Sequence, residues 1–195
     1  LAQNAGGTLY FTSAGVAIFF PTVASSAQGL TLLNTTSFSG VSSVSLAADS
    51  FTTTYENYYL IVQFDDFTAD SSCFLRLRKA GVDHTGANYS FASRGLTATA
   101  TSFDTNLNAN AAGFFLQDTD ATGYTPTYSM IKLLGPKVSQ YTGVLSEFAA
   151  STTAGVPNFQ TGGGVHAITD SYDSATIYVT GGNMTGKIIL YGWNK

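Results

Sequence analysis

The chain has 195 residues, of which 44% are hydrophobic and only 10% are charged, and its formal net charge is −4. A chain of this size with 14 Phe and 11 Tyr can bury a core of its own, which excludes an intrinsically disordered protein. The eight Lys and Arg cluster only at Arg76, Arg78 and Lys79. The basic patch of a nucleic-acid-binding protein or of a polybasic membrane anchor is therefore missing, and we expect neither partner.

The small share of charged residues has two explanations. Ser, Thr, Asn and Gly can cover the surface of a monomer, or much of the surface can be buried against partner chains, because interface cores are poor in charge. The longest apolar run, residues 14–20, is too short to span a bilayer and has no basic leader before it. We therefore expect no membrane insertion and no signal peptide, and Leu1 in place of Met indicates a processed or trimmed chain.

Residues 1–28 contain two short apolar segments, 8–12 and 16–20, which Ser13, Ala14 and Gly15 connect. Pro21 ends the second segment, and a polar stretch at 24–29 is typical of a linker. The pattern predicts an N-terminal β-hairpin. Since a lone hairpin is only marginally stable in water, we expect it to be an attachment segment that docks on another protein or on the rest of the chain.

Residues 29–195 show short β-branched and aromatic runs between Gly, Ser, Asn and Asp clusters, and almost no helical periodicity. This pattern predicts one all-β domain, an antiparallel β-sandwich of jelly-roll-like type. The predicted strands are 30–34, 41–46, 58–64, 73–79, 88–93, 113–117, 128–134, 141–148, 164–170, 176–180 and 186–191. Residues 97–110, 118–126 and 151–163 are predicted to be long surface loops, and the Gly181-Gly182-Asn183 turn predicts that the last two strands form a hairpin.

The strand predicted at 73–79 alternates clearly. Leu75 and Leu77 share one face, and Arg76 and Arg78 share the other, so we expect one buried face and one solvated basic face. Cys73 is the only cysteine and lies in the same apolar pattern. We expect a buried, unreactive thiol, and neither a disulfide nor a zinc site.

The sequence gives no pattern of catalytic residues. His84 falls in a predicted turn at 81–86, His166 falls on a predicted strand, and no Gly-x-Ser-x-Gly motif accompanies them. The neighbouring acids, Asp65, Asp66 and Asp70 in one group and Asp118 and Asp120 in another, are explained by turns and do not match a calcium loop. We therefore expect no enzyme, no catalytic residues, no bound metal and no cofactor.

Three aromatic residues lie in or beside predicted loops: Tyr124, Tyr172 and Trp193. Exposed rings stack on the apolar faces of sugars, so these residues are candidates for glycan binding. The alternative is that they pack in the core or between subunits, as most large aromatic side chains do.

Four motifs, in this order, carry a resemblance to a known module: YENY at 55–58, LRLR at 75–78, NYS at 88–90 and GKIILYG at 186–192. The sequence from Gly29 onward resembles a C-terminal β-sandwich module of fibre, spike and other virion-surface proteins of tailed bacteriophages. In that module these motifs form strands, and it typically lies at the end of a longer protein.

The resemblance implies a homotrimer on the virion surface. Two roles stay open, because fold similarity does not fix function. The first is a tail-fibre or spike-type module that attaches to host-surface polysaccharide. The alternative is a capsid-decorating protein, such as a cement protein or head fibre, that stabilises the shell. In both roles residues 1–28 would bind other virion proteins of the capsid or tail.

Overall fold

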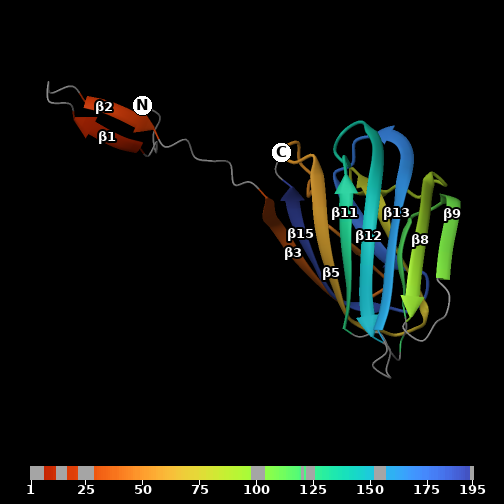
Figure 1. Ribbon diagram of the computed structural model, residues 1–195. Coiled ribbons are helices and arrows are strands. Elements are labelled where there is room, and N and C mark those ends of the chain that lie inside the picture. The colour runs from red at the N-terminus through yellow and green to blue at the C-terminus, as the bar shows by residue number, and fades with distance from the viewer. Residues whose placement is uncertain are drawn as a thin grey trace.

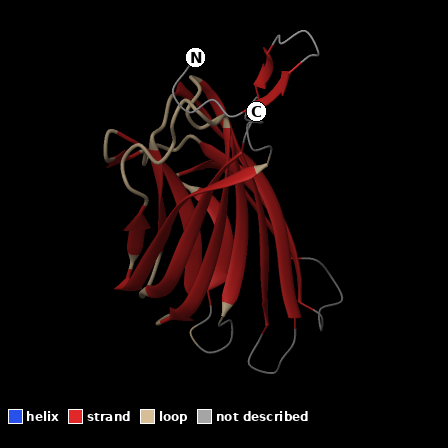
Figure 2. Ribbon diagram, turned by 90° about the vertical axis from the view of Figure 1, so that its left-hand side faces the viewer, coloured by secondary structure: helices blue, strands red, loops and turns tan. Residues whose placement is uncertain are grey.

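The computed structural model describes residues 7–11, 17–21, 29–97, 104–119, 121, 126–151 and 157–193. Every regular element among these residues is a β-strand, as the sequence predicts, and the strands pair antiparallel (Figure 2). Within these ranges there is no helix with the length and apolarity needed to cross a membrane.

Eight strands form the larger sheet (Figure 1). In spatial order they are β3 (Leu30–Val41), β15 (Met184–Trp193), β5 (Asn57–Phe67), β11 (Thr127–Leu134), β12 (Gln140–Ser151), β13 (Pro157–Asp170), β8 (Tyr89–Thr97) and β9 (Asp104–Ala111). The last strand in the sequence, β15, lies between β3 and β5 and pairs with both. Residues far apart in the chain are therefore neighbours across this sheet.

The smaller sheet has four strands in one path and a fifth beside it. Their spatial order is β10 (Phe114–Thr119), β6 (Ser71–Lys79), β14 (Ser174–Val179) and β4 (Ser43–Ser45), and β7 (Val82–Asp83) pairs with β6. A separate two-stranded sheet consists of β1 (Gly7–Phe11) and β2 (Ala17–Pro21), which pair antiparallel as the predicted hairpin requires. The division into an attachment segment and a sandwich domain at residue 28 stays a prediction.

One hydrophobic core lies between the two large sheets. Alternate residues of β5 point into it from the larger sheet, and Leu75, Leu77 and Ile177 enter it from the smaller one. Tyr58 anchors one end: its ring lies 4.5 Å from that of Phe51, and its buried hydroxyl accepts a hydrogen bond from the Thr52 amide and donates one to the Thr52 carbonyl. Each large side chain buried in this way contributes about 1.5–3 kcal/mol to folding.

The polar stretch at 97–110 is not a loop throughout, and that prediction is wrong. Residues Asp104–Ala111 form β9, which pairs with β8 at the edge of the larger sheet. Asp, Asn and Ala, which make up most of this segment, have weak strand preference of their own, so the pairing with β8 makes it a strand. The prediction for 151–163 fails in the same way, because β13 begins at Pro157 and pairs with β12.

The last two strands are not a hairpin, although the turn between them was predicted correctly. The strand β14 pairs with β6 and β4 in the smaller sheet, whereas β15 pairs with β3 and β5 in the larger one. Gly182 has a φ of +67°, the conformation for which its residue type is suited. A tight turn reverses the chain but does not decide whether the two strands pair, and here it connects the two sheets.

The basic face of β6 is less solvated than its alternation predicts. Arg76 lies with its guanidinium carbon 3.9 Å from the centre of the Tyr178 ring and donates a hydrogen bond to the Ala112 carbonyl. Arg78 forms a 2.9 Å ion pair with Asp83 on β7. On the outer side of the smaller sheet, both arginine side chains therefore contact other protein groups.

Candidate functional site

The three aromatic residues that were candidates for glycan binding have different surroundings. Tyr172 is completely buried in the core, so its ring cannot stack on a sugar. Tyr124 lies outside the described residues. Trp193 ends β15 and is 45% exposed. Of the three, Trp193 is therefore the described residue whose ring a ligand can reach.

Trp193 borders a hollow at one end of the larger sheet. The hollow has a volume of about 370 Å³ and is lined by Gly29, Leu30, Tyr59, Lys132 and Trp193. Burial, and then the nearby Glu147 carboxylate, raise the pKa of Tyr59. The hollow thus combines two aromatic rings and one ammonium group.

This hollow belongs to a larger surface, which we call the outer face. It consists of the side chains of the larger sheet that point away from the core, and they form four cross-strand rows. The strand registers give these rows in order from β3 to the far edge. They are Leu30-Trp193-Asn57-Leu134-Gly143-Val165-Ser90, Leu32-Tyr191-Tyr59-Lys132-Leu145-Gly163-Ala92-Leu107, Thr35-Ile189-Ile61-Met130-Glu147-Thr161-Arg94-Thr105 and Ser37-Lys187-Gln63-Tyr128-Ala149-Phe159-Leu96.

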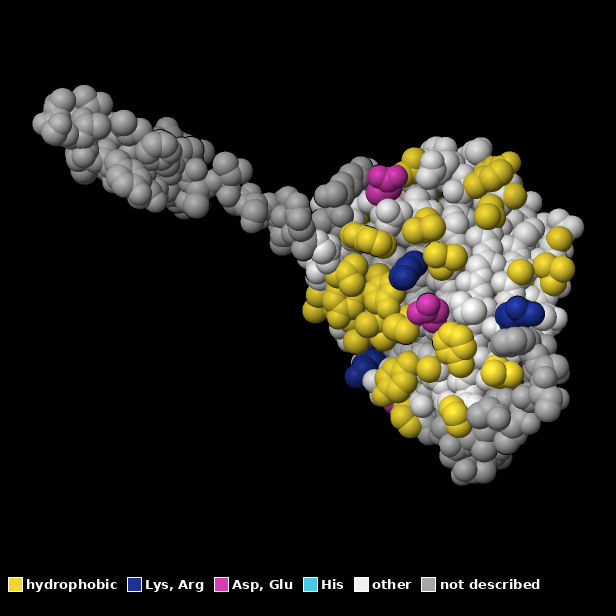
Figure 3. Space-filling model, viewed as in Figure 1, with side chains coloured by type: hydrophobic (Ala, Val, Ile, Leu, Met, Phe, Trp, Pro, Cys, Tyr) yellow, Lys and Arg dark blue, Asp and Glu magenta, His cyan; other side chains and the backbone are white. Residues whose placement is uncertain are grey.

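Large hydrophobic side chains gather on the outer face. Of the thirteen that are exposed in the described residues, ten lie in these rows, and the other three are Val82, Val138 and Tyr141. They are densest over β3, β15, β5 and β11, which we call the apolar half (Figure 3). An antiparallel sheet with one solvated face normally shows polar residues there, so this outer face does not have the composition of a surface that is exposed to water.

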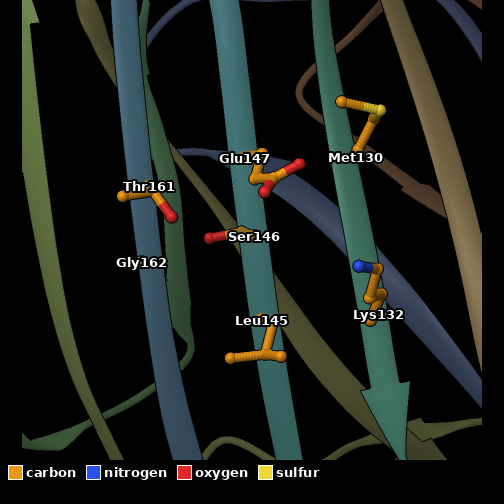
Figure 4. A pocket seen from close by; sticks show the side chains of 7 residues that line it. All are labelled: Met130, Lys132, Leu145, Ser146, Glu147, Thr161 and Gly162. Carbon is orange, nitrogen blue, oxygen red and sulfur yellow. The ribbon is translucent and has the colours of Figure 1, made fainter.

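The outer face carries four charged side chains: Lys132, Lys187, Glu147 and Arg94. Lys132 on β11 and Glu147 on β12 line one shallow hollow of about 110 Å³ (Figure 4). Neither forms an ion pair with another described residue. Both charges thus remain available to a partner.

The signal for the outer face is present in the sequence, but we missed it. In β5, Tyr58–Val62 is an unbroken apolar run, and β15 has a similar run from Ile188 to Tyr191. A strand that buries one face alternates, whereas an unbroken apolar run is typical of a strand that is covered on both faces. Tyr59, Ile61, Ile189 and Tyr191 are the residues that this rule identifies.

The two histidines, which are 82 residues apart, meet inside the molecule. The Nε2 of His166 lies 3.2 Å from the Nδ1 of His84, and the Nδ1 of His166 lies 3.0 Å from the Tyr172 hydroxyl. Tyr89 holds the backbone beside them, because its hydroxyl donates to the His84 carbonyl and accepts from the Leu77 amide. His166 lies on β13, the strand where it was predicted, whereas His84 directly follows β7, a short strand inside the range 81–86 that was predicted to be a turn.

Burial controls the chemistry of this cluster. Burial, and then the neighbouring His84, lower the pKa of His166 to about 4, so its ring is neutral at pH 7. Burial raises the pKa of Tyr172 to about 12, with a smaller contribution from Asp170. His166 and Tyr172 are fully buried. His84 is half-buried, and the hydrogen bonds of the cluster connect β13 to the β7–β8 segment.

The acidic residues are spread over the surface. Asp65 and Asp66 lie at the end of β5 and Asp118 lies in β10, so the prediction of turns is wrong for these three; side chains near strand ends reach water as those of turns do. Asp70 lies before β6 and accepts a hydrogen bond from the Ala121 amide. Asp120 is outside the described ranges. Within those ranges no three His, Cys, Asp or Glu side chains come together in a way that could hold a metal ion.

Cys73 is buried in the core, as predicted. Burial raises the pKa of its thiol far above the ordinary value, so the reactive thiolate is not populated at neutral pH.

No family model matches this chain, and a search of curated proteins finds no match either.

Proposed function

We propose that this protein is a structural module on the surface of a tailed-bacteriophage particle, of the tail-fibre or spike type, and that it acts by binding rather than by catalysis. The observation that carries the proposal is the outer face, a broad apolar sheet surface. Its hollows, of about 110 and 370 Å³, are shallow, and surfaces of this kind suit macromolecules better than small substrates.

The strand order supports a jelly-roll-like sandwich. Eight strands form two four-stranded paths, β3-β15-β5-β11 in the larger sheet and β4-β14-β6-β10 in the smaller one. Along the chain these eight strands follow the order β3, β4, β5, β6, β10, β11, β14 and β15. Strands of the two paths alternate in this order, except that β6 and β10 of the second path are consecutive. Jelly rolls combine two Greek keys in this way and are common in viral coat and lectin domains. The remaining strands, β12, β13, β8 and β9, extend the larger sheet.

Localisation on the particle tests the proposal. We expect an antibody against the purified protein, followed by gold labelling and electron microscopy, to decorate intact phage particles. The label would lie on the tail for a fibre or spike module. Particles that remain unlabelled, from a phage that encodes this chain, would refute the assignment.

Attachment to host-surface glycans is part of the proposal, and Trp193 is its main candidate. The ring is exposed at the end of β15, where its face can stack on the apolar face of a sugar. Trp193 is the only tryptophan, so its fluorescence reports directly on this hollow. We expect host polysaccharide to shift the emission of the wild type. In titration calorimetry it should bind Trp193→Ala at least tenfold more weakly than Tyr141→Ala, the matched control, which alters an exposed aromatic residue elsewhere on β12.

A capsid-decorating protein is the second candidate. The observation that favours it is the separate sheet of β1 and β2, which suits an attachment segment for a shell. In this case gold label would lie on the head, and capsids without the protein would lose their DNA at a lower temperature than capsids to which it is added back. The proposed homotrimer applies to both candidates.

A further inference from the structure

The apolar half of the outer face is covered on its inner side by the smaller sheet and on its outer side by nothing within the described residues. Outward-pointing Tyr59, Ile61, Ile189 and Tyr191 are half-buried by one another, and Leu32 is 58% exposed. Tyr, Trp and Met, which are enriched in protein interfaces, all occur here. The composition of these strands is that of a sheet buried on both faces.

We infer that a second copy of this chain covers the outer face. The inference deepens the proposed function and rests on it, since it names the partner of the surface on which that function is based. A sheet of eight strands spaced about 4.8 Å apart is about 34 Å wide, and four rows about 6.8 Å apart extend over about 20 Å. The resulting footprint of about 700 Å² is close to the roughly 800 Å² that each partner buries in a stable complex.

The charges of the outer face select a second copy over an apolar partner. Burying Lys132 and Glu147 under an apolar surface would leave two charges without partners, which is costly. A second copy brings one charge of each sign, so Lys132 of one chain can pair with Glu147 of the other. Lys132 and Lys187 lie in the rows of the apolar half, Asp65 of β5 lies beside Gln63 at the end of these rows, and Glu147 lies on the adjoining strand β12.

The row with Trp193 lies at one end of the outer face. In the complex it forms the rim, which stays accessible to water, while the rows of Tyr59 and Ile61 form the centre. Contact with another copy and access of a ligand to Trp193 are therefore compatible.

The oligomeric state in solution tests the inference. We expect light scattering on the full chain to give the mass of two or three chains, and Met130→Glu, in the central apolar row, to weaken self-association at least tenfold without changing the far-ultraviolet circular dichroism. Val82→Glu is the matched control, because Val82 is 69% exposed on β7, far from these rows in the strand order. A monomeric wild type at about 100 μM, or equal effects of the two variants, would overturn the inference.

The charge pair gives a second, independent test. Lys132→Glu and Glu147→Lys should each weaken self-association, and the double variant should restore it, because the exchanged charges again face each other. Failure of the double variant to regain the wild-type mass would contradict the pairing between copies. A chain that is monomeric yet located on phage particles would overturn this inference and the proposed homotrimer, and would leave the assignment to the phage particle intact.

Discussion

His166 on β13 and His84, which follows β7, share a hydrogen bond of 3.2 Å. This contact connects the larger sheet to the segment that follows β7 of the smaller sheet. A neutral His166 ring offers one donor and one acceptor, so a single tautomer satisfies both His84 and Tyr172. The cluster thus requires at least one neutral histidine.

Stability should fall in mild acid because of His166. Its folded-state pKa of about 4 is below the ordinary value of 6.5, so the unfolded chain takes up the proton first as the pH falls. The contribution of His166 to the free energy of unfolding is fully present above pH 6.5 and decreases between pH 6.5 and 4. It amounts to about 3 kcal/mol in total. Urea unfolding from pH 4 to 8 measures it, and His166→Gln should flatten this part of the curve. An unchanged slope in the variant would assign the effect to other groups.

Tyr58→Phe should destabilise the fold by about 1–3 kcal/mol. Removing the hydroxyl leaves the Thr52 amide and carbonyl without the partner that each has in the folded chain, next to a buried ring. Tyr59→Phe is the control, because that side chain points to the outer face, and its effect should be within about 0.5 kcal/mol. Chemical denaturation of both variants at pH 7 compares them. Equal losses would show that ring packing, not the hydrogen bonds, is responsible.

Gly164→Ala should destabilise the larger sheet. A Cβ at this position would lie 2.4 Å from the Ser90 carbonyl oxygen and 3.0 Å from the Phe91 Cβ, so β8 and β13 would have to move apart. We expect a loss of about 1–3 kcal/mol from overpacking. Gly143→Ala is the matched control, since its Cβ would meet only the Leu134 side chain, at 3.5 Å. Thermal melting of the two variants tests this explanation. A melting temperature of Gly143→Ala below that of Gly164→Ala would refute the steric explanation.

Cys73 should resist modification in the folded protein. Burial removes both access to the thiol and its thiolate form. Iodoacetamide at pH 8 should leave the native chain unmodified over hours and add one label per chain in 6 M guanidinium, as mass spectrometry would show. Rapid labelling of the native chain would indicate that the core opens around β6.

The local structure could be predicted from the sequence where burial on one face imposes alternation. Leu75 and Leu77 against Arg76 and Arg78 identify β6 in this way, and the inert Cys73 follows from the same strand. The segment of β9 could not be found, because Asn106 and Asn108 have weak strand preference and become strand through pairing with β8.

The pairing of strands that lie far apart in the chain could not be predicted from the sequence. Nothing local indicates that β14 and β15 belong to different sheets, because Gly182 and its neighbours specify only the reversal of the chain. His166 lies on the strand that the sequence predicts, but its contact with His84 depends on the order of β13 and β8 in the sheet. The apolar character of the outer face could have been predicted, because Tyr59 and Ile61 interrupt the alternation expected of a strand with one solvated face.

The position of β15 has a consequence for synthesis of the protein. The larger sheet has a gap between β3 and β5 that only residues 184–193 can fill. While these residues are still inside the ribosome, both flanking strands have unpaired edges that can bind other chains. The sheet can therefore be completed only after residues 184–193 have been synthesised, and a chaperone that covers strand edges should raise the yield of folded protein during translation.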